Sequence, residues 1–308
     1  MTDLHERGHL LTEQVNPNSQ NLDQLSCLEL VEIFNREDEK AVAAVAAAKI
    51  QLAQAIERTA ECLQKGGRLF YVGAGTSGRL GVLDAAECPP TFCTPPELVQ
   101  GIIAGGAAAL VRSSEDLEDR FQDGEAAIQE RQVTQQDVVV GITAGGTTPY
   151  VHGAINAARQ RGATTIFIAC VPAEQVSVKA DIEIRLLTGP EVLAGSTRLK
   201  AGTATKLALN ILSTGVMVRL GKVYGNRMVD VAVTNNKLRD RALRILQDLT
   251  GLSREASDIL LERSGKWVKL ALLMHWTGLD KEQSLQLLSQ NQGNLRAAIA
   301  SGKNYNKF

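Results

Sequence analysis

Segments that combine glycine with hydroxyl side chains are the parts of this chain best suited to bind a ligand. The first, Gly73-Ala-Gly-Thr-Ser-Gly78, follows a short apolar run and precedes a helical pattern. Glycines let backbone N–H groups approach an anion, and a helix N-terminus attracts negative charge. The segment lacks the GK[ST] ending of a P-loop, and no acidic residue ends a second strand as a dinucleotide site requires. We expect Gly75, Thr76 and Ser77 to bind a phosphate; the alternative is a tight turn that needs its glycines.

Two further segments of this kind follow a strand or open a helix. Thr143–Thr148 comes after an apolar run, and Gly195–Lys200 opens a long apolar segment. Because open parallel sheets bind ligands at the carboxyl ends of their strands, we expect these segments to face one crevice. Ser196 and Thr197 fit a helix N-cap equally well. The sequence predicts a small phosphorylated ligand rich in hydroxyls, and the further candidate ligand-binding residues are Gly145, Gly146, Thr147, Thr148, Ser196, Thr197 and Lys200.

The elements that must position these loops alternate between strand and helix. Strand-like runs are expected at residues 68–72, 98–104, 137–142, 164–168 and 182–187, with helices at 37–63, 79–87, 149–161 and 196–220. This alternation is typical of an α/β fold with a parallel sheet and helices on both faces. From residue 237 onward the pattern is helical throughout. We predict an N-terminal helical segment at 1–54, an α/β domain at 55–236 and a helical region at 237–308.

Composition narrows the class of protein. Over 308 residues, 33 Lys and Arg balance 34 Asp and Glu, and no long apolar stretch or signal-peptide pattern occurs. We therefore expect no nucleic-acid partner and no membrane association. Five cysteines without a CxxC pair indicate free thiols and a cytoplasmic location. The four histidines are scattered, His152 is expected to be structural, and we predict no metal and no other cofactor.

The residues Gly73-Ala-Gly-Thr-Ser-Gly-Arg-Leu-Gly-Val-Leu-Asp-Ala-Ala-Glu-Cys-Pro-Pro-Thr91 resemble the signature of the N-acetylmuramic acid 6-phosphate etherases, a family with a sugar isomerase (SIS) domain. Residues 12–26, 195–204 and 222–235 are similar to other segments of that family. The resemblance implies an SIS-type three-layer α-β-α fold and assigns residues 55–236 to it. The helical tail is similar, more loosely, to the small UBA-like unit that ends these proteins.

The resemblance also implies a reaction. The family cleaves the D-lactyl ether of N-acetylmuramic acid 6-phosphate to N-acetylglucosamine 6-phosphate and D-lactate, in amino-sugar catabolism and peptidoglycan recycling. Sugar ring opening makes the C2 proton acidic, a base removes it, an acid protonates the leaving lactate, and water adds at C3. Carried over by motif, Glu87 is the acid and Glu118 the second catalytic group, acting at C2. Glu87 ends an apolar helix face, so we expect it to be partly buried; without the resemblance, the acidic run around Glu118 would read as a solvated helix face.

The second phosphate loop differs from the family motif, and Glu87 lies far along its helix from the first loop. Gly145-Gly-Thr-Thr-Pro-Tyr150 stands where Ser-Gly-Arg-Thr-Pro-Tyr is expected, so a hydroxyl and a guanidinium are missing from the second phosphate loop. An unbroken helix from Ser77 to Glu87 would separate the two by roughly 15 Å, too far for one small sugar. We therefore predict a homodimer with shared sites. The alternatives are a non-catalytic sugar-phosphate sensor and a sugar-phosphate isomerase.

Overall fold

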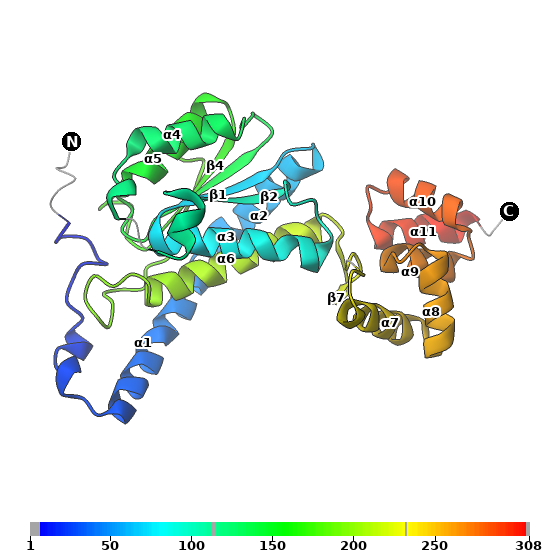
Figure 1. The fold of residues 1–308 in the computed structure, drawn as a ribbon, viewed down its shortest axis with the longest axis horizontal. Helices are drawn as coiled ribbons and strands as arrows, with labels where there is room; N and C mark the ends of the chain where they lie inside the picture. The colour runs from blue at the N-terminus through cyan, green and yellow to red at the C-terminus, as the bar shows by residue number, and fades with distance from the viewer. Residues whose placement is uncertain (1–6, 113–114, 232, 306–308) are drawn as a thin grey trace. The chain divides into compact units, whose positions relative to one another are not determined.

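The computed structural model describes residues 7–112, 115–231 and 233–305, and these form two compact units (Figure 1). The first unit contains the chain up to Ala86 and from Pro96 to Thr214. The second contains Glu87–Pro95 and the chain from Gly215 onward. The domain boundaries expected near residues 54 and 236 stay predictions. Among the described residues, no helix has the length and apolar character needed to cross a membrane.

The first unit is built on a parallel sheet of five strands. These are β1 (Leu69–Gly73), β2 (Val99–Ile103), β3 (Val138–Ile142), β4 (Thr164–Ala169) and β5 (Ile182–Arg185). Their order is β2-β1-β3-β4-β5, and each of the three central strands β1, β3 and β4 is buried along its whole length. The strand order reverses at β1, because β2 lies on one side of it and β3, β4 and β5 follow on the other, and this switch point is where open α/β sheets bind ligands. The predicted parallel sheet is confirmed.

Helices cover both faces of the sheet, as the alternating pattern predicts. Figure 1 shows α4 (Phe121–Glu130) and α5 (Pro149–Gln160) on one face, and α3 (Gly75–Phe92) and α6 (Lys200–Arg219) on the other. The N-terminal helices are α1 (Cys27–Ala47) and α2 (Lys49–Gln64), and 3-10 turns occupy Pro17–Ser19, Leu22–Gln24, Gly106–Leu110 and Glu115–Leu117. A capping box between Ser26 and Glu29 fixes the start of α1. The three-layer α-β-α fold is confirmed.

Alternate residues of β1 join the sheet to different layers. Phe70 and Val72 pack in one buried cluster with Val151 and Ala154 of α5. The hydroxyl of Tyr71 donates to the Asp84 carboxylate on α3 at 2.9 Å, on the opposite face. The period of two along a strand places these neighbours on opposite faces.

The single helix expected over residues 37–63 is wrong: the chain there forms α1 and α2, because Ala48, with ψ 12°, leaves the helical conformation between them. Two further helices begin elsewhere than the sequence pattern predicts. α3 begins at Gly75 and not at residue 79, because Gly78 lets the first turn pack directly on the strand ends. A Cβ added at Gly78 would lie 2.6 Å from Cγ1 of Ile103 and 2.7 Å from the oxygen of Gly73. α6 begins at Lys200 and not at residue 196, because the buried Glu191 carboxylate accepts from the backbone N–H groups of Lys200 and Ala201, both at 2.9 Å.

The second unit is helical apart from a short hairpin of β6 (Val223–Tyr224) and β7 (Arg227–Met228). Its helices after the hairpin are α7 (Asn236–Thr250), α8 (Arg254–Arg263), α9 (Val268–Thr277), α10 (Lys281–Gln290) and α11 (Leu295–Tyr305). They enclose an apolar core of their own, and α9 is buried nearly all round. The helical character of this region is as predicted, while its likeness to a UBA unit stays a prediction.

Candidate active site

A cavity of about 140 Å³ lies at the carboxyl ends of β1 and β3. It is smaller than the roughly 300–1,000 Å³ of most small-molecule sites, so it fits one part of a ligand. All three predicted loops contribute to it, together with the N-terminal segment. The candidate residues among its described lining are Gly75, Thr76, Ser77, Glu118, Gly145, Thr147, Thr148 and Thr197. Of the other candidates, Gly146, Ser196 and Lys200 stand outside that described lining.

The first loop is the opening turn of α3. Thr76 and Ser77 are half-buried there and line the cavity. The early N–H groups of a helix lack intrahelical partners, so this turn presents donors and a positive dipole end beside two hydroxyls. This is a suitable environment for a phosphate.

The second loop is held by contacts within its own unit. The hydroxyls of Thr143 and Thr148 lie 2.8 Å apart, and Nε2 of His152 lies 2.7 Å from the carbonyl oxygen of Gly146. Burial lowers the pKa of His152, which favours the neutral ring that packs on Phe167 with ring centroids 5.7 Å apart. His152 therefore positions the loop, in agreement with a structural role.

The third loop contributes side chains and not the first amides of its helix. Glu191 binds the amides of Lys200 and Ala201, so these donors are not available to a ligand. Thr197 of this loop lines the cavity instead, together with Thr205 of α6. Neither Ser196 nor Thr197 supplies the cap that the sequence suggests. The sequence does not predict this role of Glu191, because a single glutamate after Gly-Pro gives no sign that it caps a helix that begins nine residues later.

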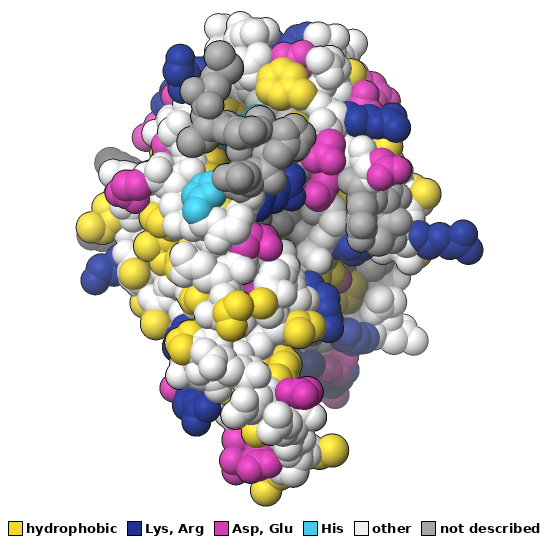
Figure 2. Space-filling view, turned by 90° about the vertical axis from the view of Figure 1, so that its left-hand side faces the viewer, with side chains coloured by type: hydrophobic (Ala, Val, Ile, Leu, Met, Phe, Trp, Pro, Cys, Tyr) yellow, Lys and Arg dark blue, Asp and Glu magenta, His cyan; other side chains and the backbone are white. Residues whose placement is uncertain are grey.

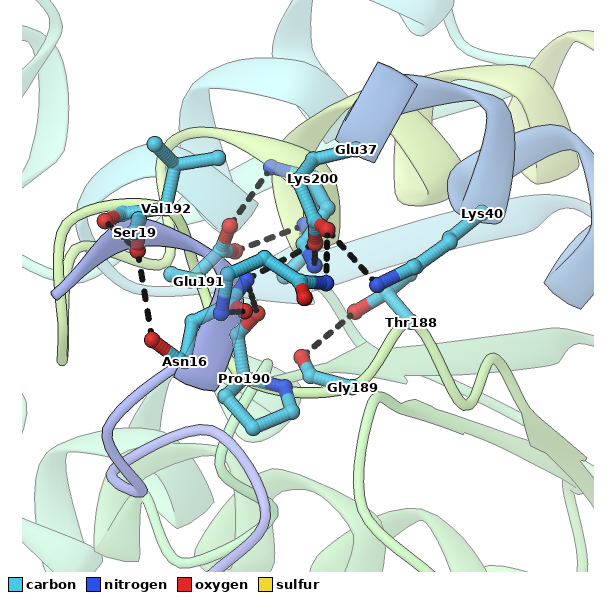
Figure 3. A network of polar contacts seen from close by, with 12 residues as sticks. Asn16, Ser19, Glu37, Lys40, Thr188, Gly189, Pro190, Glu191, Val192 and Lys200 are labelled. Atoms are coloured by element: carbon cyan, nitrogen blue, oxygen red, sulfur yellow. Dashed lines mark hydrogen bonds and ion pairs between the residues drawn. The ribbon is translucent and has the colours of Figure 1, made fainter. Parts of the chain in front are cut away.

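Lys200 does not point to a ligand in this structure. Its Nζ donates to Oε2 of Glu37 at 2.6 Å, and both side chains are completely buried (Figure 3). Glu37 also accepts from Asn16, Asn18 and Lys40. Burial alone would raise the pKa of Glu37, but hydrogen bonds led by Lys200 outweigh it and hold that pKa far below its ordinary value. A buried carboxylate needs its cation, so Lys200 is engaged by Glu37 in this structure and lies outside the described lining of the cavity, and its contact with a substrate stays a prediction.

Glu118 reaches the cavity from the loop before α4. The backbone N–H of Tyr150 donates to its carbonyl oxygen at 3.0 Å, which fixes Glu118 beside the start of α5. Its carboxylate is half-exposed and lies 3.9 Å from Nη1 of Arg7. The side chain is therefore positioned to act on a ligand that fills the cavity.

Glu87 lies farther along α3, which is unbroken from Gly75 to Phe92. Ten residues from Ser77 correspond to roughly 15 Å along the helix axis. Glu87 is exposed and not partly buried as expected, because the helical period turns it away from the face that buries Asp84 and Cys88.

Comparisons with known proteins identify the domain that carries this cavity. Profiles of the SIS domain and of the glucokinase regulatory protein N-terminal SIS domain match residues 116–214 and 51–159. A profile of the C-terminal lid domain of glucokinase regulatory protein matches residues 225–269. Together, the parallel sheet and the loops at its switch point define the first unit as an SIS domain.

Comparison with full-length relatives shows to which family of SIS-domain proteins the chain belongs. Proteins of Nostoc punctiforme and Crocosphaera subtropica named N-acetylmuramic acid 6-phosphate etherase are 82% and 74% identical over 307 and 304 residues. The alignments cover 100% and 99% of this chain and 100% of each relative. The chain belongs to the N-acetylmuramic acid 6-phosphate etherase family.

Proposed function

We propose that this protein is a carbon–oxygen lyase that cleaves the D-lactyl ether of N-acetylmuramic acid 6-phosphate. The products are N-acetylglucosamine 6-phosphate and D-lactate, and the reaction serves the catabolism of cell-wall amino sugars. The identity of 82% with a full-length relative named for this activity is the observation that carries the proposal. The cavity supports it, since hydroxyls and a helix N-terminus suit a sugar phosphate.

The phosphate binds among the opening turn of α3 and the hydroxyls of Thr76, Ser77, Thr147 and Thr148. Thr197 adds a hydroxyl from the third loop. These contacts fix the open-chain sugar so that its C2 lies near a base and its lactyl oxygen lies near an acid. Such positioning contributes as much to catalysis as the acid and base themselves.

Glu118 removes the C2 proton in this proposal, because it is the catalytic candidate that lines the cavity. The electron pair shifts toward C3, the C3–O bond breaks, and Glu87 gives its proton to the departing lactate oxygen. Water then adds at C3 of the unsaturated aldehyde, and the proton returns to C2. The scheme requires no metal or redox cofactor.

We propose that Glu87 acts in the site of a second copy of the chain. The distance along α3 keeps Glu87 away from the phosphate bound at the start of the same helix. Its exposure makes the carboxylate accessible to another copy. α1 also exposes Leu28 and Val31, at 68% and 57%, on one helical face, as a homodimer contact would require.

The reaction takes place in the cytoplasm, according to the same proposal. All five cysteines are free thiols, as is usual in a reducing compartment. The substrate is a phosphorylated sugar, and the proposal requires neither nucleic acid nor a membrane.

Incubation with N-acetylmuramic acid 6-phosphate and mass spectrometry of the products tests the proposal. Free D-lactate with N-acetylglucosamine 6-phosphate is the expected result, and its rate falls by at least roughly a hundredfold in Glu118→Gln. A rearranged sugar that keeps its lactyl group would indicate an isomerase. Binding without turnover would indicate a sensor.

A further inference from the structure

The charges around the cavity are unusual for a phosphate site. Among the described residues that line it, Arg7 is the single cation, whereas Glu13 and Glu118 are both acidic. The face of the molecule in Figure 2 mixes Lys and Arg with Asp and Glu and forms no broad basic patch. The second loop lacks the guanidinium expected after Gly146. A phosphate dianion near two carboxylates needs a cation close to it.

The N-terminal segment that carries Arg7 is firmly anchored. Leu10 is 1% exposed and belongs to the core cluster beneath the sheet loops. The Gln175 side chain binds the backbone on both sides of Leu10, since the N–H of Leu11 donates to Oε1 at 3.0 Å and Nε2 donates to the oxygen of His9 at 2.9 Å. A turn closed by Leu10 N–H and the oxygen of Arg7, at 2.9 Å, places Arg7 at the cavity.

This segment packs against the very loop that lacks its own cation. A Cβ added at Gly145 would lie 3.6 Å from Oγ1 of Thr12 and 3.8 Å from Cδ1 of Leu10. The Thr12 side chain is completely buried there. The space beside Gly145 is thus bordered by the N-terminal segment, and Arg7 of that segment lines the same cavity as Gly145.

Arg7 is held only weakly by protein carboxylates. Its nitrogens lie 3.9 Å from Oε1 of Glu118 and 3.7 Å from Oδ1 of Asp119, and its side chain is 43% exposed. Exposed ion pairs at such distances contribute little to stability, so the guanidinium can leave these carboxylates for a ligand that binds it more strongly. A phosphate is such a ligand, because the planar fork of arginine binds two of its oxygens at once.

We infer that Arg7 binds the 6-phosphate of the substrate and determines specificity for phosphorylated sugars. The inference rests on the proposed function and assigns to the N-terminal segment the cation that the second loop lacks. Gln175 acts as a positioning residue, because it fixes the turn from which Arg7 extends.

Calorimetric titration of the full-length protein with N-acetylglucosamine 6-phosphate tests this inference, since that sugar has the phosphate but no lactyl carboxylate. We expect Arg7→Ala to weaken binding by roughly tenfold to a hundredfold, and Arg7→Lys by less. Arg58→Ala, which removes another half-exposed, ion-paired arginine far along the chain, is the matched control and should bind as the unmodified protein does. Gln175→Ala alone should weaken binding of the sugar phosphate. When it is combined with Arg7→Ala, binding should be no weaker than in Arg7→Ala alone.

Unchanged affinity in Arg7→Ala, with an unchanged melting temperature, would overturn the inference. Loss of affinity for N-acetylmuramic acid 6-phosphate alone would also overturn it, because Arg7 would then bind the lactyl carboxylate. Equal binding of phosphorylated and unphosphorylated N-acetylglucosamine by the unmodified protein would overturn it as well. The proposed function fails separately, if the unmodified protein releases no D-lactate from N-acetylmuramic acid 6-phosphate.

Discussion

At the scale of single residues, two glycines of the phosphate loops have opposite steric demands. A side chain at Gly78 would collide with the backbone of Gly73 at 2.7 Å, whereas one at Gly145 would meet its nearest atom at 3.6 Å. Gly78 therefore permits a close approach of helix and strand, and Gly145 occupies ordinary space. The sequence shows two similar glycine-rich loops and cannot reveal this difference, which depends on how the helix start packs.

Gly78→Ala should lower the free energy of unfolding by about 1–3 kcal/mol, the usual cost of overpacking, and should weaken phosphate binding as α3 shifts. The free energy of unfolding of Gly145→Ala should differ from that of the unmodified protein by less than about 0.5 kcal/mol. Urea unfolding and calorimetric titration of both variants measure the contrast. Equal effects of the two substitutions would show that α3 does not depend on the contact at Gly78.

The catalytic candidates were predictable to different degrees. Glu118 sits in an acidic run that alone favours a solvated surface, and only the family signature selects it; the structure then places it at the cavity. Glu87 was expected to be partly buried, but the register of α3 exposes it. Arg7 carries no motif, and the contact between the N-terminal segment and the second loop is visible only in the folded chain.

At the scale of elements, the alternating pattern predicted every strand of the main sheet and most helices, because buried parallel strands are continuous apolar runs. The starts of α3 and α6 were wrong by four residues each. Both depend on long-range contacts, with Ile103 for α3 and Glu191 for α6, which local propensity does not contain. The buried Glu37–Lys200 pair escaped prediction for the same reason, since 163 residues separate the partners.

The ion pair that joins α1 to α6 makes stability depend on pH. The pKa of Glu37 is lowered from 4.5 in the folded protein, so its stabilising contribution is complete above that value and is lost as pH falls below it. Glu37→Gln should cost about 3–5 kcal/mol at pH 7, because Lys200 stays buried without its counter-charge.

Urea unfolding at pH 7 and at pH 4 should show that this difference between the two proteins shrinks on acidification. Glu57→Gln on α2 removes an exposed glutamate and should change stability by less than about 0.5 kcal/mol at either pH. A difference that stays constant with pH would mean that the pKa of Glu37 is not lowered by folding.

For the whole molecule, the length of α3 favours an assembly in which two copies of the chain share their active sites. If each site takes its phosphate loop from one copy and Glu87 from another, two inactive variants should complement each other. Mixing Glu87→Ala with a Thr76→Ala/Ser77→Ala variant, followed by subunit exchange, should give mixed dimers with one intact site of two and thus about half the full activity. Background activity after demonstrated exchange would mean that one chain supplies both elements.

In the proposed reaction the lactyl ether is broken by elimination, and water then adds to the sugar. Reaction of N-acetylmuramic acid 6-phosphate in ¹⁸O-labelled water, followed by mass spectrometry of both products, tests it most directly. We expect ¹⁸O to enter N-acetylglucosamine 6-phosphate at C3 and the released D-lactate to stay unlabelled. Label in the lactate, or sugar that forms without label at C3, would contradict it.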